Sequence, residues 1–334
     1  MTTLQTEVAE VAERTGFSGA VRVDREGDTV VCAAHGLADR AHGIPATVDT
    51  QFAMASGTKS LTAVTVMALV EQGTLRLDTT ARSLLGEDLP LVGDGVTVEH
   101  LLAHRSGIGD YLDESSGGNV RDYALPVPVH ELATSEAYLR VLDGRPRVFA
   151  PGERFTYTNS GYVLLAVLAG RAAGTDLPTL VSDLVCDPAG MPDTAFLRTD
   201  SLPGRGAVGY LDATGLRTNV LHLPVRGSGD GGTYSTLADL HALWSALFAG
   251  QIVAPPLVAE LLRPCSDWPQ ESRRYGLGFH LAAAGDAVFM EGYDAGVSFL
   301  SLHQPSTAIT YTILANWSEG AWPMIRLLDE RLGT

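Results

Sequence analysis

One serine and one lysine, separated by two residues, have the types and the spacing needed for nucleophilic chemistry. The segment reads Ser56-Gly57-Thr58-Lys59, and helical periodicity runs from Ser56 to about Gln72. Residues three apart share one face of a helix, so the hydroxyl and the amine are predicted to be neighbours. A serine hydroxyl is a weak nucleophile without an adjacent base, and a lysine that has lost its proton supplies one. Free N–H groups at the start of the helix favour a developing oxyanion.

Lys59 is the only lysine in the chain, although Lys and Arg together number 23. Arginine therefore carries the rest of the basic charge, and arginine does not give up its proton in proteins. The single amine stands where a group that can lose a proton would be needed. Taken alone, the four residues also fit a helix cap followed by a solvated lysine.

A second segment places Tyr157 two residues before Asn159. A phenol can relay a proton between a nucleophile and a leaving group, and an amide can orient a substrate carbonyl. Tyr157 alone also fits the ordinary role of an aromatic residue in the core.

A third segment, Met290-Glu291-Gly292-Tyr293, falls on a predicted strand and turn. Glycine there permits close approach of the backbone to a ligand. By itself this segment also fits a plain hairpin.

In this order and at these spacings, the three segments resemble the S-x-x-K, Y-x-N and [KH]-x-G motifs of class C β-lactamases, D,D-peptidases and related esterases. The similarity to this penicillin-recognising family extends from about residue 17 to about residue 317. Six further segments carry it: residues 17–21, 50–56, 77–78, 101–107, 231–236 and 275–279. The resemblance implies a serine hydrolase that acts through an acyl-serine intermediate.

The resemblance also implies a role for each matching residue. Ser56 would attack the carbonyl, Lys59 would accept the hydroxyl proton, and Tyr157 would hold or relay it. Asn159 would bind the ester or amide part of the substrate. The backbone N–H groups of Ser56 and Tyr293 would form the oxyanion hole, because Tyr293 directly follows the glycine of the third motif.

The third motif departs from the family pattern at its first position, which holds Met290 in place of Lys or His. Met290, Glu291 and Gly292 are still predicted to belong to the substrate-binding part of the site. A thioether cannot hold a carboxylate by charge, so the departure weakens the β-lactamase and D,D-peptidase assignments unless a nearby arginine replaces the anchor. It favours a neutral ester or amide, or acyl transfer to an acceptor other than water.

An alternative outside the enzymes is a penicillin-binding-type protein that binds a ligand without turnover. Met290 is the only feature in its favour. The retention of Ser56, Lys59 and Tyr157 opposes it.

The elements that position these residues change in type along the chain. Helical patterns are predicted at residues 4–14, 56–72, 97–103, 131–142, 160–173, 178–186, from 235, and around 327–328; strand patterns are predicted at 19–23, 29–33, 275–281, 287–291, 297–302 and 309–314. The order predicts an α/β (α+β) fold, with an antiparallel sheet of about five strands flanked by terminal helices. A helical domain of residues 56–239 would be inserted into a sheet domain of residues 1–55 and 240–334, with the active site in the cleft between them.

Composition limits the partners. The formal net charge of −16 argues against nucleic acid and against anionic membranes, which leaves a small-molecule ester, amide or peptide as the expected partner. The start of the chain has no basic stretch followed by an apolar run, and the three cysteines are odd in number, which together predict a cytoplasmic protein. The natural substrate and the oligomeric state are left open.

No cofactor is predicted. His100 and His104 are four residues apart, but no third metal ligand accompanies them, and His104 is expected to bond to the backbone. The glycine-rich run at residues 227–232 lacks the Lys-Ser/Thr of a phosphate loop and is predicted to be a turn at the rim of the active site. The loop at residues 107–129 is predicted to shape the pocket.

Overall fold

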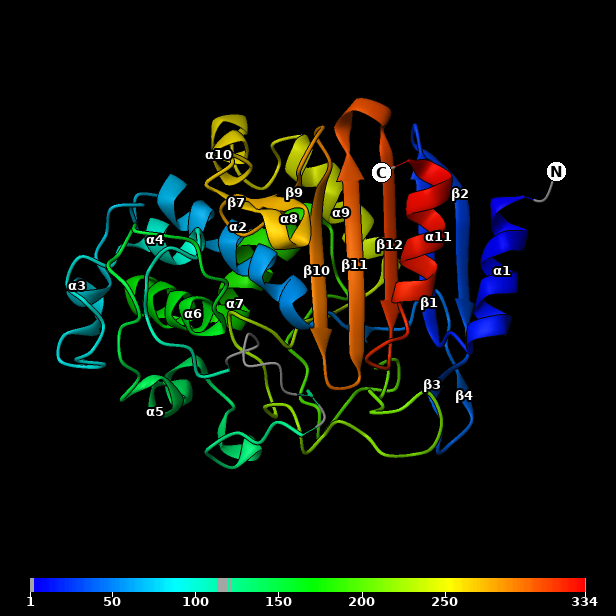
Figure 1. Cartoon of the computed structure of the whole chain (residues 1–334), viewed down its shortest axis with the longest axis horizontal. Coiled ribbons are helices and arrows are strands. Elements are labelled where there is room, and N and C mark those ends of the chain that lie inside the picture. The colour runs from blue at the N-terminus through cyan, green and yellow to red at the C-terminus, as the bar shows by residue number, and fades with distance from the viewer. Residues whose placement is uncertain (1–2, 113–118, 121, 334) are drawn as a thin grey trace.

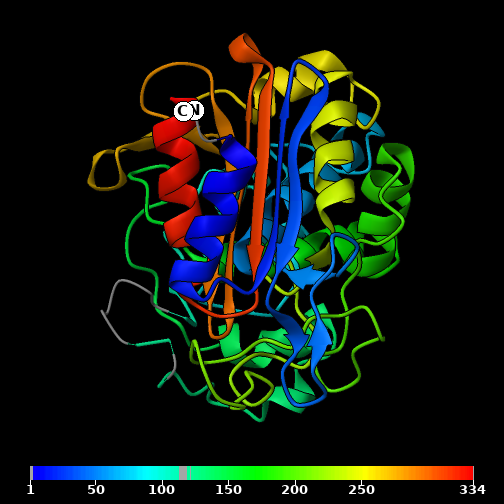
Figure 2. The same cartoon turned by 90° about the vertical axis from the view of Figure 1, so that its right-hand side faces the viewer.

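The computed structural model of the chain describes residues 3–112, 119–120 and 122–333. An eight-stranded antiparallel sheet lies between a pair of terminal helices on one face and a larger group of helices on the other (Figures 1 and 2). The strand order is β2-β1-β12-β11-β10-β9-β8-β7, so strands from both ends of the chain meet inside one sheet. The predicted α/β architecture is confirmed.

Five long strands form most of the sheet, and three short strands extend it beyond the predicted number. The long strands are β1 (Gly19–Arg25), β2 (Asp28–His35), β10 (Val288–Asp294), β11 (Val297–Gln304) and β12 (Ile309–Ala315); the short ones are β7 (Ser266–Trp268), β8 (Arg273–Tyr275) and β9 (His280–Ala282). Two small ladders, β3 (Leu37–Asp39) with β4 (Ile44–Pro45) and β5 (Phe52–Ala53) with β6 (Tyr234–Ser235), lie outside the main sheet.

The run at residues 275–281 is not the single strand that its composition predicts. It contains the end of β8, a turn and the start of β9. The turn includes Gly278 at φ +94°, and a Cβ built on this glycine would lie 2.2 Å from the Cβ of Ala63. Glycine is required here by both the backbone conformation and the close packing against the neighbouring helix.

The terminal helices α1 (Leu4–Thr15) and α11 (Trp322–Leu332) pack side by side on the outer face of the sheet (Figure 2). The side chain of Thr3 caps α1 at its start, and Gly16 ends it in the left-handed conformation. Val8 and Leu328 belong to the apolar core that these helices form against the sheet.

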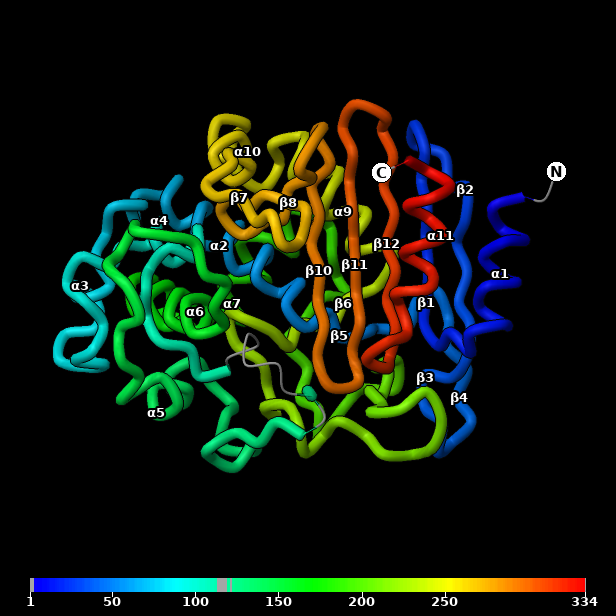
Figure 3. Tube along the Cα trace, viewed as in Figure 1, coloured from blue at the N-terminus to red at the C-terminus, as the bar shows by residue number. Residues whose placement is uncertain are grey.

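The helical group on the other face surrounds α2, which follows the short strand β5 along the chain (Figure 3). Every residue from Thr58 to Leu69 of α2 is buried, which is typical of a helix enclosed on all sides. The helices of this group are α2 (Thr58–Glu71), α3 (Ala81–Leu85), α4 (Val98–Leu102), α5 (Leu139–Leu142), α6 (Asn159–Ala173), α7 (Leu177–Val181), α8 (Asp187–Ala189), α9 (Leu237–Phe248) and α10 (Pro255–Leu261).

Short helical turns connect these elements. They are the 3-10 turns η1 (Ala55–Gly57), η3 (Val129–Glu131), η4 (Ser135–Tyr138), η6 (Pro269–Glu271) and η7 (Pro305–Thr307), and the π turn η5 (Ser182–Cys186). The predicted domain boundary between residues 239 and 240 falls inside α9. The division into two domains stays a prediction.

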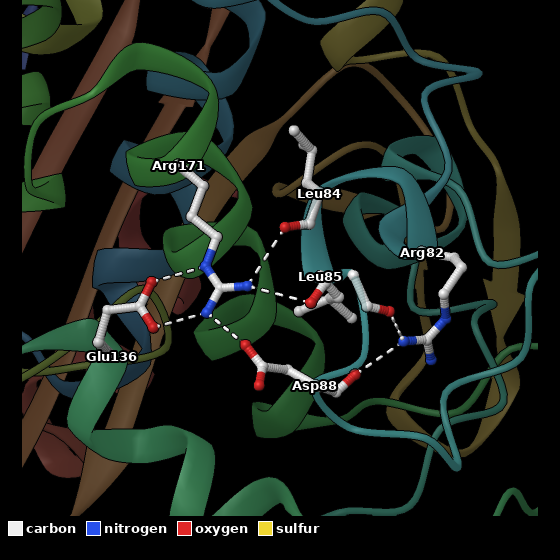
Figure 4. A network of polar contacts seen from close by, with 7 residues as sticks. Arg82, Leu84, Leu85, Asp88, Glu136 and Arg171 are labelled. Carbon is white, nitrogen blue, oxygen red and sulfur yellow. Dashed lines mark hydrogen bonds and ion pairs between the residues drawn. The ribbon is translucent and has the colours of Figure 1, made fainter.

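Arg171, in the last turn of α6, ties that helix to two neighbouring segments (Figure 4). Its guanidinium donates to both carboxylate oxygens of Glu136 at 2.8 Å and to the carboxylate of Asp88 at 2.7 Å. It also donates to the backbone carbonyls of Leu84 and Leu85. These bonds fix η4 beside α6, and η4 carries Tyr138, a residue of the active-site cavity.

Among the described residues, no single helix is long and apolar enough to cross a membrane. One pair of helices, Asn159–Ala173 with Leu177–Ala189, meets the length and composition of a span only when taken together, and it is bent by 82°.

Candidate active site

Ser56 lies in η1, the turn between β5 and α2, and not within the α2 helix itself. The preceding residue, Ala55, has φ 44°, a left-handed conformation that is uncommon for a residue with a side chain. Such a conformation costs about 1–3 kcal/mol and is held by the surrounding structure. The strained turn places Ser56 in the wall of a cavity, as is expected of a nucleophile.

The Lys59 amine lies beside Ser56. Its Nζ is 2.9 Å from Ser56 Oγ, 2.7 Å from Asn159 Oδ1 and 2.8 Å from the backbone oxygen of Asp230, and the residue is 1% exposed. The amide and carbonyl oxygens can only accept hydrogen bonds, so Nζ donates to both. Nζ also donates to Ser56 Oγ, so it lies directly beside the hydroxyl whose proton it would accept in the reaction. That arrangement is the one a base needs.

Asn159, the first residue of α6, is oriented by Asp110. The Asp110 carboxylate accepts hydrogen bonds from the backbone N–H groups of Asn159 and Ser160, both at 2.9 Å, and from the Ser160 hydroxyl at 3.0 Å. It thereby caps α6, whose N-cap residue Thr158 makes no side-chain cap bond. A carboxylate at a helix N-terminus is also favoured by the helix dipole.

Tyr157 lies next to the amine in a group of stacked rings. Lys59 Nζ is 5.0 Å from the centroid of the Tyr157 ring. The ring lies 4.3 Å from that of His104 and 5.6 Å from that of Trp268, centroid to centroid. The structure therefore brings Ser56, Lys59 and Tyr157 together although they come from separate segments.

His104 supports the segment that carries Tyr157. Its Nδ1 accepts from the backbone N–H of Thr158 at 3.1 Å, and its Nε2 lies 3.2 Å from the hydroxyl of Tyr275. Burial lowers the pKa of His104 well below its usual value, which keeps the ring neutral and able to accept at Nδ1. His104 has the backbone-bonding role that the sequence predicts.

Gly292 in β10 packs directly against the segment that carries Ser56. A Cβ built on Gly292 would lie 1.9 Å from the backbone oxygen of Met54 and 3.1 Å from the backbone nitrogen of Ser56. Only glycine fits here. Tyr293, the next residue, lines the cavity beside Ser56.

The structure corrects the prediction that Glu291 and Met290 belong to the substrate-binding part of the site, because neither side chain reaches it. Successive side chains of a strand point to opposite faces. With Gly292 against Ser56, the Glu291 side chain points to the other face, where it forms an ion pair with Arg273 at 3.2 Å. Met290 shares the face of Gly292 but is 0% exposed, belongs to the apolar core and is not among the cavity residues.

The cavity beside Ser56 has a volume of about 460 Å³. Five tyrosines contribute to its wall: Tyr111, Tyr123, Tyr138, Tyr234 and Tyr293. The described part of the 107–129 loop lines it as predicted, whereas residues 113–118 and 121 lie outside the described residues. The glycine-rich run at residues 227–232 also borders it, through Gly227, Asp230, Gly231 and Gly232.

Gly292→Ala is expected to lower the rate of ester hydrolysis by about 100-fold, since a misplacement of about 1 Å near reacting atoms has an effect of this size. The new methyl group must push η1 and β10 apart. Initial rates with p-nitrophenyl butyrate measure the effect. Gly204→Ala is the matched control, because its Cβ meets nothing within 4 Å. An unchanged rate in Gly292→Ala would show that the contact does not hold the reacting groups.

The residues that the sequence missed are Asp110, Tyr111 and Asp230. Asp110 and Tyr111 belong to a loop with no local periodicity, and Asp230 lies among glycines, so no pattern marks them. Asp230 contributes a backbone oxygen to Lys59, and backbone groups carry no signature of residue type.

The comparisons with known proteins agree with the motifs. A family model described as Beta-lactamase matches residues 4–332. Esterase EstB of Burkholderia gladioli is 38% identical over 210 residues, which are 58% of this chain and 50% of that protein. Penicillin-binding protein 4* of Bacillus subtilis is 29% identical over 335 residues, with 95% of this chain and 72% of that protein covered. This chain therefore spans half of the first relative's length.

The fold has a close counterpart among solved structures. The crystal structure of a penicillin binding protein from Bacillus halodurans superposes with a TM-score of 0.91 at 32% identity, covering 97% of this chain and 99% of that one. The resemblance drawn from the three motifs is thereby confirmed. With the family model matched almost from end to end, the chain belongs to the β-lactamase family of serine hydrolases.

Proposed function

We propose that this protein hydrolyses a carboxylic ester or amide through an acyl-enzyme formed on Ser56. The observation that carries the proposal is the 2.9 Å approach of Lys59 Nζ to Ser56 Oγ, while two acceptor-only oxygens occupy the amine's other neighbouring positions. Family membership supports the reaction class. The name of the relative EstB supports an ester as one substrate type.

Each proton and bond in the reaction has a place. Ser56 Oγ attacks the carbonyl carbon while its proton passes to Lys59 Nζ, and the N–H groups of Ser56 and Tyr293 receive the oxyanion. The oxyanion collapses, the bond to the leaving group breaks, and the proton passes through Tyr157 to the leaving oxygen or nitrogen. Water then attacks the acyl carbon while one of its protons passes to Lys59 Nζ. The bond between the acyl carbon and Ser56 Oγ breaks, Oγ regains that proton, and the acid leaves.

The test is incubation with p-nitrophenyl acetate, p-nitrophenyl butyrate, nitrocefin and a D-Ala-D-Ala peptide, followed by measurement of the intact mass. We expect turnover of the nitrophenyl esters and a transient mass increase equal to one acyl group. If none of the four probes acylates the protein or is turned over, the proposed function is contradicted.

Benzylpenicillin is expected to inactivate the protein no faster than its methyl ester. Met290 is buried, and no Lys or Arg is among the described residues of the cavity wall, so none of the described residues there supplies a cation for the free carboxylate. An anchored carboxylate would give the acid an advantage of about 10- to 100-fold, the size of a charge-assisted hydrogen bond. Inactivation rates of the two compounds, measured side by side, decide the matter. An advantage of that size for the acid would overturn the prediction.

A further inference from the structure

Asp230 presents a buried carboxylate to the cavity that contains Ser56. The residue is 7% exposed and belongs to the cavity wall. The backbone oxygen of Asp230 accepts a hydrogen bond from Lys59 Nζ at 2.8 Å, so the residue lies next to the reacting groups. Hydrolysis of a neutral ester needs the backbone oxygen but makes no use of the carboxylate.

Among the residues that the structure describes, few donors reach the Asp230 carboxylate. The hydroxyl of Tyr111 donates to its Oδ2 at 2.5 Å, and the backbone N–H of Asp230 itself is the other donor among the described residues. A carboxylate has about four acceptor positions, and burying one with few donors is costly. Burial raises the pKa of Asp230, against the opposing effects of Lys59 and of the Tyr111 hydrogen bond. A cationic donor from outside would lower that cost.

The surroundings also favour a cation over an anion. The described residues of the cavity wall include no Lys or Arg, and they include two further carboxylates, Asp122 and Asp294. Aromatic rings of Tyr111, Tyr138 and Tyr234 lie in the same wall, and the faces of such rings attract cations. A carboxylate-bearing acyl group would be repelled from this wall, whereas an ammonium group would be drawn to it.

We propose that Asp230 binds an ammonium group on the acyl part of the substrate, so that the protein acts on esters or amides of amine-bearing acids such as amino acids. This inference rests on the proposed function. Tyr111 fixes one carboxylate oxygen, and the other receives an N–H of the substrate. The apolar and aromatic wall contacts the substrate's side chain. Asp230 is then a residue that determines specificity, separate from those that move protons.

The test compares methyl esters that differ in one amine: those of D-phenylalanine, L-phenylalanine and 3-phenylpropionic acid. In the wild type, kcat/KM for at least one phenylalanine ester is expected to exceed that for the phenylpropionate by about 10-fold or more. In Asp230→Asn, which keeps an oxygen for Tyr111 but removes the charge, that advantage should disappear. The loss for the phenylalanine esters should appear mainly in KM and should exceed by about 10-fold any loss for the phenylpropionate, which reports the contact of Asp230 with Lys59.

Two further variants separate recognition from support of the fold. Asp28→Asn removes an equal charge at the exposed start of β2, at the far edge of the sheet, and should leave the amine preference unchanged. Tyr111→Phe removes the donor but keeps the carboxylate, and should also retain the preference. If Asp230→Asn does not fold, the ratio of kcat/KM for the phenylalanine esters to that for the phenylpropionate, measured in the wild type and in Tyr111→Phe, still provides the test.

Two results would overturn the inference. One is a wild-type kcat/KM for the phenylpropionate equal to or above those for both phenylalanine esters. The other is an equal loss for all three esters in Asp230→Asn, which would mean that the residue only supports Lys59. Acylation by p-nitrophenyl acetate alongside either result would leave the proposed function standing, whereas absence of any acylation would remove both.

Discussion

Ser56→Ala is expected to abolish the acyl-enzyme and to lower ester turnover by about 10⁴-fold or more, the scale on which nucleophile deletions act in serine hydrolases. The variant keeps the strained turn at Ala55, the cavity and the Lys59 contacts to Asn159 and Asp230. Only the atom that forms the covalent bond is lost. Steady-state rates with p-nitrophenyl butyrate and intact-mass measurements after rapid quenching give the two readouts.

Ser60→Ala is the matched control, because it makes the same change four residues further along, in α2. Ser60 Oγ donates to the backbone oxygen of Gly278 at 2.7 Å and is committed to packing α2 against that turn. Its loss should reduce stability slightly and change turnover by no more than about threefold. Undiminished turnover in Ser56→Ala would refute the assignment of the nucleophile.

Lys59→Arg is expected to lower turnover by about 10³-fold or more, although it keeps a positive charge at the position. Arginine cannot accept the serine proton, and its planar head does not fit the three neighbours that surround Nζ at 2.7–2.9 Å. Lys59→Met, which has similar length and no charge, should be equally inactive. The two variants together separate the need for a base from the need for a cation.

The solitary lysine also permits a direct observation. Because the chain contains one lysine, lysine-selective isotope labelling gives one side-chain NMR signal. The chemical shift of this signal reports whether the Lys59 side chain is a neutral amine or an ammonium at the pH of turnover. A rate for Lys59→Arg within about tenfold of the wild type would point to another base.

The parts of the site that the sequence predicts are the local ones. Ser56 and Lys59 are neighbours because of helical spacing, which can be read from four residues. The alternation of side chains along a strand can also be read from the sequence. It places Gly292 and Glu291 on opposite faces, which excludes the Glu291 side chain from the site once Gly292 is assigned to it. Tyr157 is different, since it comes from a segment about 100 residues away and only the family resemblance joins it to the lysine.

The parts that the sequence does not predict depend on loops and on backbone atoms. Asp110 reaches the start of α6 from a loop, and Asp230 approaches Lys59 through its carbonyl oxygen. Neither contact follows a period of 2 or 3.6 residues. The same holds for β7, β8 and β9, which have three residues each, too few for an alternating pattern to be recognised.

The site at which an acyl group is trapped tests the central claim most directly. Cleavage after arginine and lysine releases residues 41–59 as one peptide, and Ser56 is its only serine. After rapid acid quenching of the wild type with p-nitrophenyl butyrate, the mechanism predicts one butyryl group on this peptide, with fragment masses that place it on Ser56. A butyryl group on any other residue, with Ser56 unmodified during turnover, would contradict it.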